Sequence, residues 1–348
     1  MNTKCASTTV ELLAPIWERV LRRPSIGIND IFFRAGGNLV TADLLFAEIA
    51  RELGREFPSA VIFQAPTIAT LASVLEQTSV PRLSPFVQLK VGREKPPIFI
   101  APNLDGRASF SRLAACIQTD HSIYGIQAKG LDGMEEPLDR IEDMAQFYLD
   151  SIDELQSEGP YILIGYSFGG LVALEMAQRL SHKGRNVGLL VLVESYPHSR
   201  YLSLGQRITL SAKRVRGHMA NMKQMPAGHA VSYVMGGIKP RLRRVGVHST
   251  HLSNPSCLSL ERTTLRVKDK SYVAMAHYRP RPYGGKINFV KSKSESFFPR
   301  DPLPVWTRLA AALQVETVPG SHLGMVTVHA ESLAAVLTGY VREALRQE

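Results

Sequence analysis

Apolar positions follow two different patterns, one before about residue 80 and one after about residue 95. In the first region they recur at the three- and four-residue spacing of amphipathic helices. Three helices are predicted there: one that covers Leu13 to Leu21 and stops before Pro24, one that starts after an Asn38 N-cap, and one over residues 66–76 with proline at its entry. Three helices in so short a stretch predict a small helical bundle.

From Pro96 onward, short unbroken apolar runs replace the helical spacing. Such runs are typical of parallel strands that are buried on both faces. Helical segments lie between the runs, the clearest with an apolar stripe from Ile141 to Leu155. This alternation predicts a doubly wound α/β sheet. The runs are PIFIAP, SIYGIQA, YILIGY, GLLVLVES and KINFVKS.

The alternation stops between about residues 197 and 283. That stretch is too long for a plain loop, so we interpret it as an inserted, mostly helical lid. The segment TSVPRLSPF, residues 78–86, carries prolines and serines and indicates a linker. The predicted organisation is a helical domain over 6–79, a linker over 80–94, and an α/β domain over 95–348 that contains the lid.

Composition places the chain among ordinary globular proteins, with 348 residues, 45% of them hydrophobic and 21% charged. No apolar run is long enough to cross a bilayer, and the start of the chain lacks the apolar core of a secretory signal. The three cysteines, Cys5, Cys116 and Cys257, have no metal-ligand spacing and are interpreted as reduced thiols. We therefore expect a cytoplasmic protein with no metal site and no membrane partner.

The net charge of +10 is concentrated between Arg200 and Lys270. Such a block can be a solvated surface, a nucleic-acid-binding face, or a face for an acidic protein or a phosphate-bearing arm. Nucleic acid ranks last, because the basic residues are not interleaved with aromatic ones and no nucleic-acid-binding module is present.

The strongest chemical signal is the segment GYSFGG. It contains G-x-S-x-G as Gly165, Ser167 and Gly169, with an apolar strand before it and an amphipathic helix after it. That context is the one a nucleophile elbow requires, and the helix start supplies free backbone N–H groups. Ser167 is therefore the predicted nucleophile; the alternative is a glycine-rich structural turn.

A serine hydroxyl becomes a good nucleophile only when a base takes its proton. The expected chain order is serine, acid, histidine. Glu194 ends the strand after the elbow, and His322 lies in a glycine-flanked loop after the last predicted strand. Both positions belong to the sheet edge on which Ser167 is expected. We predict His322 as the base and Glu194 as the acid, with Asp301 as the alternative acid.

The oxyanion of an acyl-transfer reaction needs two hydrogen-bond donors. One predicted donor is the backbone N–H of Phe168, directly after the nucleophile. The other should come from the loop after the first predicted strand, APNLDG, where we predict Asn103 and keep Leu104 as the alternative.

From about Pro96 to its end, the chain resembles the type I thioesterase domains of nonribosomal peptide and polyketide synthases. The segments that carry the resemblance are GLDGMEEP, GPYILIGYSFGGLVALEMAQ, LLVLVESYP, YRPRPYGGKINFV and VPGSHLGM. The resemblance implies an α/β-hydrolase fold with a lid and a Ser167–Glu194–His322 triad that takes an acyl group from a phosphopantetheine thioester. One departure is Glu194, since the family usually has the shorter aspartate there.

The first 80 residues resemble the acyl or peptidyl carrier domain of the same synthases, through INDIFFRAGGN and FQAPTIATLASVLE. Leu39 stands where the family has the serine that holds phosphopantetheine, and Arg34 stands where an acidic residue is common. Leucine has no hydroxyl to modify. Thr41 is a poor substitute, because two positions along a helix turn its side chain by about 200°. We therefore expect no phosphopantetheine on this domain.

These observations together predict a serine hydrolase of the thioesterase type. Its substrate would be an acyl or peptidyl group on the phosphopantetheine of a separate carrier protein or synthase module, in secondary-metabolite biosynthesis. The open alternatives are an acyltransferase or cyclase that uses the same acyl-enzyme, an ordinary lipase or esterase, and a non-catalytic docking protein.

Overall fold

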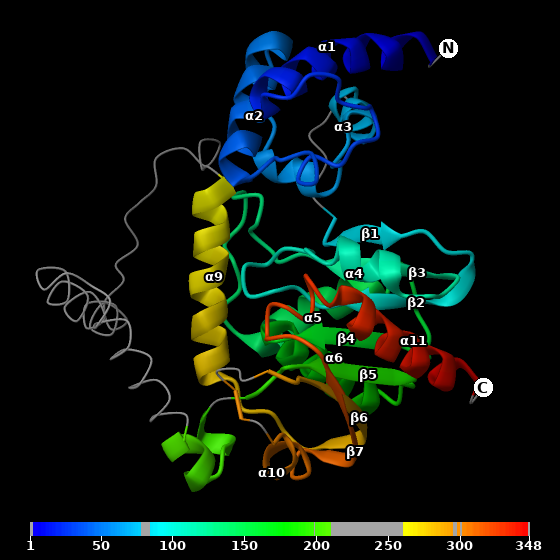
Figure 1. The fold of residues 1–348 in the computed structure, drawn as a ribbon, viewed down its shortest axis with the longest axis vertical. Helices are drawn as coiled ribbons and strands as arrows, with labels where there is room; N and C mark the ends of the chain where they lie inside the picture. Colours follow the sequence, from blue (N-terminus) through cyan, green and yellow to red (C-terminus); the bar gives the residue numbers. More distant parts are fainter. Residues whose placement is uncertain are drawn as a thin grey trace, which may run out of the picture.

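The computed structural model has a helical domain at its N-terminal end and an α/β domain after it (Figure 1). It describes residues 3–77, 84–197, 199–209, 260–294, 298–299 and 301–346.

The helical domain contains three α-helices and one 3-10 helix in its described part. Asn38 and Thr67 are the N-caps of the second and third α-helices, and each forms a reciprocal capping box with a threonine three residues later. Large side chains such as Trp17 and Phe32 fill a core of its own. The elements are α1 (Thr3–Leu21), α2 (Leu39–Leu53), η1 (Ser59–Phe63) and α3 (Ile68–Leu75).

The α/β domain is built on a seven-stranded sheet with the order β1-β3-β2-β4-β5-β6-β7. All neighbouring pairs are parallel except β1 and β3, which are antiparallel. The central strands β4 and β5 are buried along their whole length, as their unbroken apolar runs predict. The strands are β1 (Phe86–Lys90), β2 (Glu94–Ile100), β3 (His121–Ile126), β4 (Ile162–Tyr166), β5 (Leu189–Val193), β6 (Tyr283–Ser292) and β7 (Ala310–Val318).

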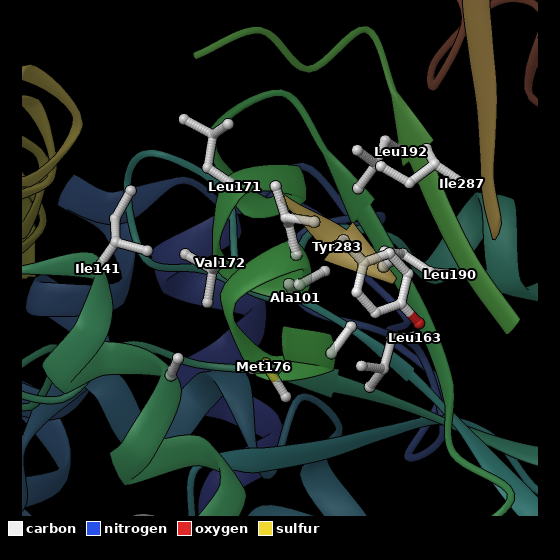
Figure 2. Close-up of a cluster of buried hydrophobic side chains, with 14 of the residues drawn as sticks. Ala101, Ile141, Leu163, Leu171, Val172, Met176, Leu190, Leu192, Tyr283 and Ile287 are labelled. Atoms are coloured by element: carbon white, nitrogen blue, oxygen red, sulfur yellow. The ribbon is translucent and has the colours of Figure 1, made fainter. Parts of the chain in front are cut away.

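Helices cover both faces of this sheet, and each face has its own apolar cluster. On one face, Leu171, Val172 and Met176 of the helix that follows β4 belong to one buried apolar cluster with Leu190 and Leu192 of β5 (Figure 2). The fold is therefore the predicted three-layer, doubly wound sheet. The helices of the first face are α5 (Ile141–Ile152), α6 (Phe168–His182) and α9 (Leu260–His277), those of the second are α4 (Ser111–Cys116) and α11 (Ala330–Arg346), and η2 (Ser199–Tyr201) and α10 (Leu303–Trp306) are short connections.

Two strands were not among the predicted runs. Residues 86–90, which we had interpreted as part of the linker 80–94, form β1 and pair with β3. Strand β7 pairs with β6. Both strands lie at an edge of the sheet and are only partly buried, so neither has the continuous apolar run that marks a central strand.

The predicted lid at 197–283 is described only at its two ends. Residues 204–209 are helical at its N-terminal end, and α9 lies at its C-terminal end, before β6. Residues 210–259, which hold most of the basic block, lie outside the described residues. On α9 itself, Arg266 pairs with Glu136 at 2.5 Å and Lys270 with Asp139 at 2.8 Å.

Candidate active site

Ser167 occupies a sharp turn between β4 and α6. Its backbone has φ +54° and ψ −117°, a conformation that is strained for a residue with a side chain. Three glycines allow the turn. A Cβ at Gly165 would lie 2.4 Å from Gly169 O, and one at Gly170 would lie 1.8 Å from Ser195 Oγ. The glycines therefore permit the close backbone packing of a tight turn, with Ser167 at the edge of the sheet. This is the geometry predicted for a nucleophile elbow.

The loop after β2 packs directly on the elbow. A Cβ at Gly169 would lie 2.7 Å from the carbonyl oxygen of Pro102, so only glycine permits this approach. Phe168 is the first residue of α6, where backbone N–H groups have no acceptor within the helix. The N–H of Asn103 lies 3.4 Å from Arg107 O, a long and weak hydrogen bond. The predicted donors Phe168 and Asn103 thus belong to segments in contact, and Leu104 lies in the same loop.

Glu194 follows β5 and is almost fully buried, with 2% of its surface exposed. Its backbone φ of +47° is also in the left-handed region. Its Oε1 accepts a 2.7 Å hydrogen bond from the backbone N–H of Ser292, at the end of β6. Burial by itself would raise the pKa of the Glu194 carboxyl, but neighbouring His322 and the N–H of Ser292 together outweigh it, and the net pKa lies below its usual value. The carboxylate is therefore charged at neutral pH.

His322 lies in the loop after β7, with Nδ1 3.5 Å from Oε2 of Glu194. Both atoms are buried, and neither has a closer hydrogen-bond partner among the described residues. The imidazole stacks on Tyr166, with ring centroids 4.7 Å apart, and Phe298 lies on it at 4.9 Å. The Tyr166 hydroxyl also donates a 2.9 Å hydrogen bond to the carbonyl oxygen of His322. The ring is thus oriented by two aromatic side chains and one carboxylate.

Asp301, the alternative acid, is placed differently. Its side chain is exposed, and its Oδ1 accepts a 3.0 Å hydrogen bond from the N–H of Leu303, where α10 begins. Its backbone oxygen accepts from Gln206. The described contacts of Asp301 are therefore with Leu303 and Gln206, whereas Glu194 lies beside His322.

Sequence reasoning did not find four residues that shape this site. Ser292 acts on Glu194 mainly through its backbone N–H, which its residue type does not announce. Phe298 lies in a loop with no periodic pattern. Tyr166 and Gly170 do carry a signal, because Tyr166 lies inside the G-x-S-x-G motif and Gly170 directly follows it, where the elbow packs closely.

The start of α2 is the second predicted site. Leu39 is the first residue of the helix, directly after the Asn38 cap. Thr41 Oγ1 accepts a hydrogen bond from Asn38 N at 2.7 Å and donates one to Asn38 O at 3.0 Å, so its hydroxyl is engaged in the cap. Neither residue fits covalent attachment of phosphopantetheine: Leu39 has no oxygen, and the hydroxyl of Thr41 is occupied.

Other chemistry is sparse in the described ranges. There, no three His, Cys, Asp or Glu side chains gather where they could hold a metal ion. Cys116 is a half-buried free thiol. Of the helices that the structure describes, none combines the length and the apolar character needed to span a membrane.

Two family models match the chain. The family model described as a thioesterase domain matches residues 96–339. The chain belongs to the thioesterase domain family. In front of this thioesterase domain, the model for a phosphopantetheine attachment site matches residues 11–75. The range of this carrier-domain match includes Leu39.

Curated relatives of this thioesterase are much longer than the chain. The chain is 30% identical over 310 residues to a dimodular nonribosomal peptide synthase of Bacillus subtilis, which covers 84% of this chain and 12% of that protein. It is 37% identical over 188 residues to indigoidine synthase of Streptomyces lavendulae, covering 53% of this chain and 15% of that one.

Solved structures support the fold. A four-domain nonribosomal peptide synthetase aligns with 94% of this chain and 26% of its own, at 21% identity and a TM-score of 0.55. A type II thioesterase from the borrelidin biosynthetic cluster aligns with 75% of this chain and 98% of its own, at 19% identity and a TM-score of 0.51. At these identities the likeness establishes the α/β architecture and the helical domain in front of it.

Proposed function

We propose that this protein releases acyl or peptidyl groups from phosphopantetheine thioesters through an acyl-Ser167 intermediate. The observation that carries the proposal is the pairing of His322 Nδ1 with Glu194 Oε2, two buried atoms 3.5 Å apart with no closer hydrogen-bond partner among the described residues. This pair lies at the end of the sheet where the elbow presents Ser167. Membership in the thioesterase domain family and the synthase relatives supply the substrate class.

The first half of the reaction forms the acyl-enzyme. Ser167 Oγ attacks the thioester carbonyl carbon while His322 takes the hydroxyl proton. The negative oxygen of the tetrahedral intermediate is stabilised by the N–H groups of Phe168 and Asn103. The carbon–sulfur bond then breaks, and the leaving sulfur takes the proton from His322, so that it departs as the free thiol of phosphopantetheine.

The second half frees the enzyme. A water molecule gives its proton to His322 and attacks the ester carbonyl; the Ser167–acyl bond breaks, and Ser167 recovers its proton. The product is a carboxylic acid. Throughout, the charged Glu194 stabilises the imidazolium form of His322, and the 2.7 Å bond from Ser292 N keeps the carboxylate oriented. Burial and then the charge of Glu194 raise the pKa of the Tyr166 hydroxyl, so it remains protonated and continues to donate to the His322 carbonyl.

The acyl group comes from a carrier other than residues 11–75. Leu39 cannot carry phosphopantetheine, so the helical domain of this chain supplies no thioester of its own. The proposed substrate is therefore an acyl-loaded carrier of a separate protein or synthase module, whose arm reaches Ser167 from outside.

The decisive experiment measures intact-protein mass after mixing with an acyl-loaded carrier protein and with short acyl-pantetheine thioesters. Wild type, Ser167→Ala and the control Ser157→Ala, an exposed serine in a bend, are compared. We expect an acyl adduct or released acid with wild type and Ser157→Ala, and neither with Ser167→Ala. Turnover that survives in Ser167→Ala would overturn the covalent mechanism, and inactivity of wild type on both substrates would overturn the proposed function.

A further inference from the structure

The helical domain and the α/β domain meet at the start of α9. The backbone N–H of Leu260, the first residue of α9, donates to both carboxylate oxygens of Asp43 on α2, at 2.8 and 3.0 Å. Leu260 itself is 1% exposed and belongs to the apolar core of the helical domain. An acidic side chain from one domain thus caps a helix of the other, where it also complements the positive end of the helix dipole.

This junction uses the face of α2 that would carry phosphopantetheine. Leu39 and Asp43 are four residues apart on one helix, so their side chains are neighbours on one face. Leu39 is half-buried and packs against the same core cluster that includes Leu260. In place of an exposed serine with a long arm, this position has an apolar side chain that packs on the core to which Leu260 also belongs.

Further along α9, its residues contact segments of the candidate active site. Along α9, Val267 lies against the loop after β2, where a Cβ at Gly106 would be 2.6 Å from Val267 Cγ1. That loop contains Asn103, the proposed oxyanion donor, whose carbonyl accepts from Gly106 N at 2.8 Å. Just beyond the end of α9, the Tyr278 hydroxyl donates to Glu175 of α6 at 3.1 Å. The helix α9 therefore contacts the oxyanion loop and reaches the nucleophile helix, and it passes beside the sheet from the helical domain (Figure 1).

We propose that the helical domain is a docked cap, fixed on the α/β domain instead of moving as a carrier domain does. Asp43 and Leu260 are then positioning residues for the reaction. By fixing the start of α9, they hold the loop with Asn103 in place for the transition state. The catalytic part of this inference rests on the proposed function, whereas the docking itself does not. The alternative is that the junction is a marginal surface contact with no effect on the site.

The test compares Asp43→Ala, Asp43→Asn and Glu52→Ala. Asparagine retains an oxygen that can cap α9, whereas alanine does not; Glu52 is an exposed carboxylate on the same helix and controls for loss of charge. Hydrogen–deuterium exchange reports the docking without reference to activity. We expect exchange in 260–267 and in the 103–107 loop to rise about fivefold in Asp43→Ala, the effect of a lost cap, and to stay near wild type in the other two.

Kinetics with a short acyl-pantetheine thioester report the coupling. Because the loop acts on the transition state, we expect Asp43→Ala to lower kcat several-fold with little change in KM, and Asp43→Asn to restore it. Leu260→Ala, which removes the apolar half of the junction, should give the same pattern. Unchanged exchange in both Asp43→Ala and Leu260→Ala would overturn the docked cap. Raised exchange with unchanged kcat would overturn the positioning role, and an inactive wild type with the expected exchange pattern would refute the proposed function alone.

Discussion

Two helix starts in this protein invite comparison, that of α6 at Ser167 and that of α2 at Leu39. Each follows a glycine-containing turn and each is the point where its domain would present a reactive hydroxyl. At α6 the backbone is strained, with φ +54°, and the hydroxyl is present. At α2 the backbone is relaxed around a regular Asn38 cap, and leucine stands in the place of the serine.

The difference shows that the carrier-like fold does not depend on a hydroxyl at position 39. The helical domain has a complete core, reciprocal capping boxes at α2 and α3, and no hydroxyl at position 39. An exposed serine contributes little to folding, so its loss leaves the domain intact, and a half-buried leucine adds apolar contact there. At Ser167 the backbone is strained, which lowers stability. Such strain is typical of functional sites.

The largest expected effect comes from restoring the missing hydroxyl. Leu39→Ser, incubated with coenzyme A and a broad-specificity phosphopantetheinyl transferase, should gain one phosphopantetheine, whereas wild type should gain none. Intact mass measures both. Asp43→Ala added to Leu39→Ser should speed the loading, because it releases the face of α2 that meets α9.

Thr41→Ala is the matched control for that comparison. The Thr41 hydroxyl is engaged by Asn38, so wild type and Thr41→Ala should both remain unmodified. A phosphopantetheine adduct on wild type would break the contrast between the two helix starts.

The next largest effect is on kcat and comes from the carboxylate of Glu194, which lies beside His322. Glu194→Gln retains the length and the acceptor for Ser292 N but loses the charge that stabilises the imidazolium of His322. We expect kcat on an acyl-pantetheine thioester to fall by about 10²- to 10⁴-fold. Glu194→Asp retains the charge one methylene further from His322 and should lose only about tenfold. An equal loss in Asp301→Asn would mean that the acid has been assigned to the wrong residue.

The smallest effect is on stability in acid. The pKa of Glu194 in the folded protein lies below its ordinary value of 4.5, so its contribution to stability is fully present above pH 4.5 and is lost as the pH falls through the folded-state value. Urea midpoints measured at a series of pH values from neutral to acid should therefore fall more steeply for wild type than for Glu194→Gln. Parallel curves would show that the carboxylate gains nothing from His322 and Ser292.

The sequence predicts most of this fold because its central strands are marked twice, by apolar runs and by the helices between them. β4 and β5 are buried on both faces, so their sequences are continuous apolar runs that predict strands. β1 and β7 lie at the sheet edges and are only partly buried, so their sequences show a weaker apolar pattern. The start of α2 is equally predictable, because the Asn38 cap and the helical spacing of apolar residues from Ala42 to Ile49 are both local signals.

The site was predictable where its residues follow strands and unpredictable where they act through the backbone. The predicted triad residues Ser167, Glu194 and His322 all follow strands, so topology alone assigns them to one edge of the sheet. Sequence does not choose between Glu194 and Asp301, because both come after strands. What favours Glu194 is its 3.5 Å contact with His322 and a hydrogen bond from Ser292, 98 residues away in the chain. The junction of Asp43 with Leu260 joins residues 217 apart and leaves no pattern in either segment.

Leucine at position 39 also changes the order of the reaction. A carrier tethered beside its enzyme presents its arm at an effective concentration of about a millimolar, independent of how much protein is present. If the acyl group is held by a separate carrier protein, as proposed, this thioesterase instead meets each substrate by diffusion. Its rate then rises with the concentration of the loaded partner and saturates, and non-acylated carriers compete for the same approach. Under this proposal, one side chain converts an intramolecular step into a bimolecular one, and the abundance of the partner controls product release.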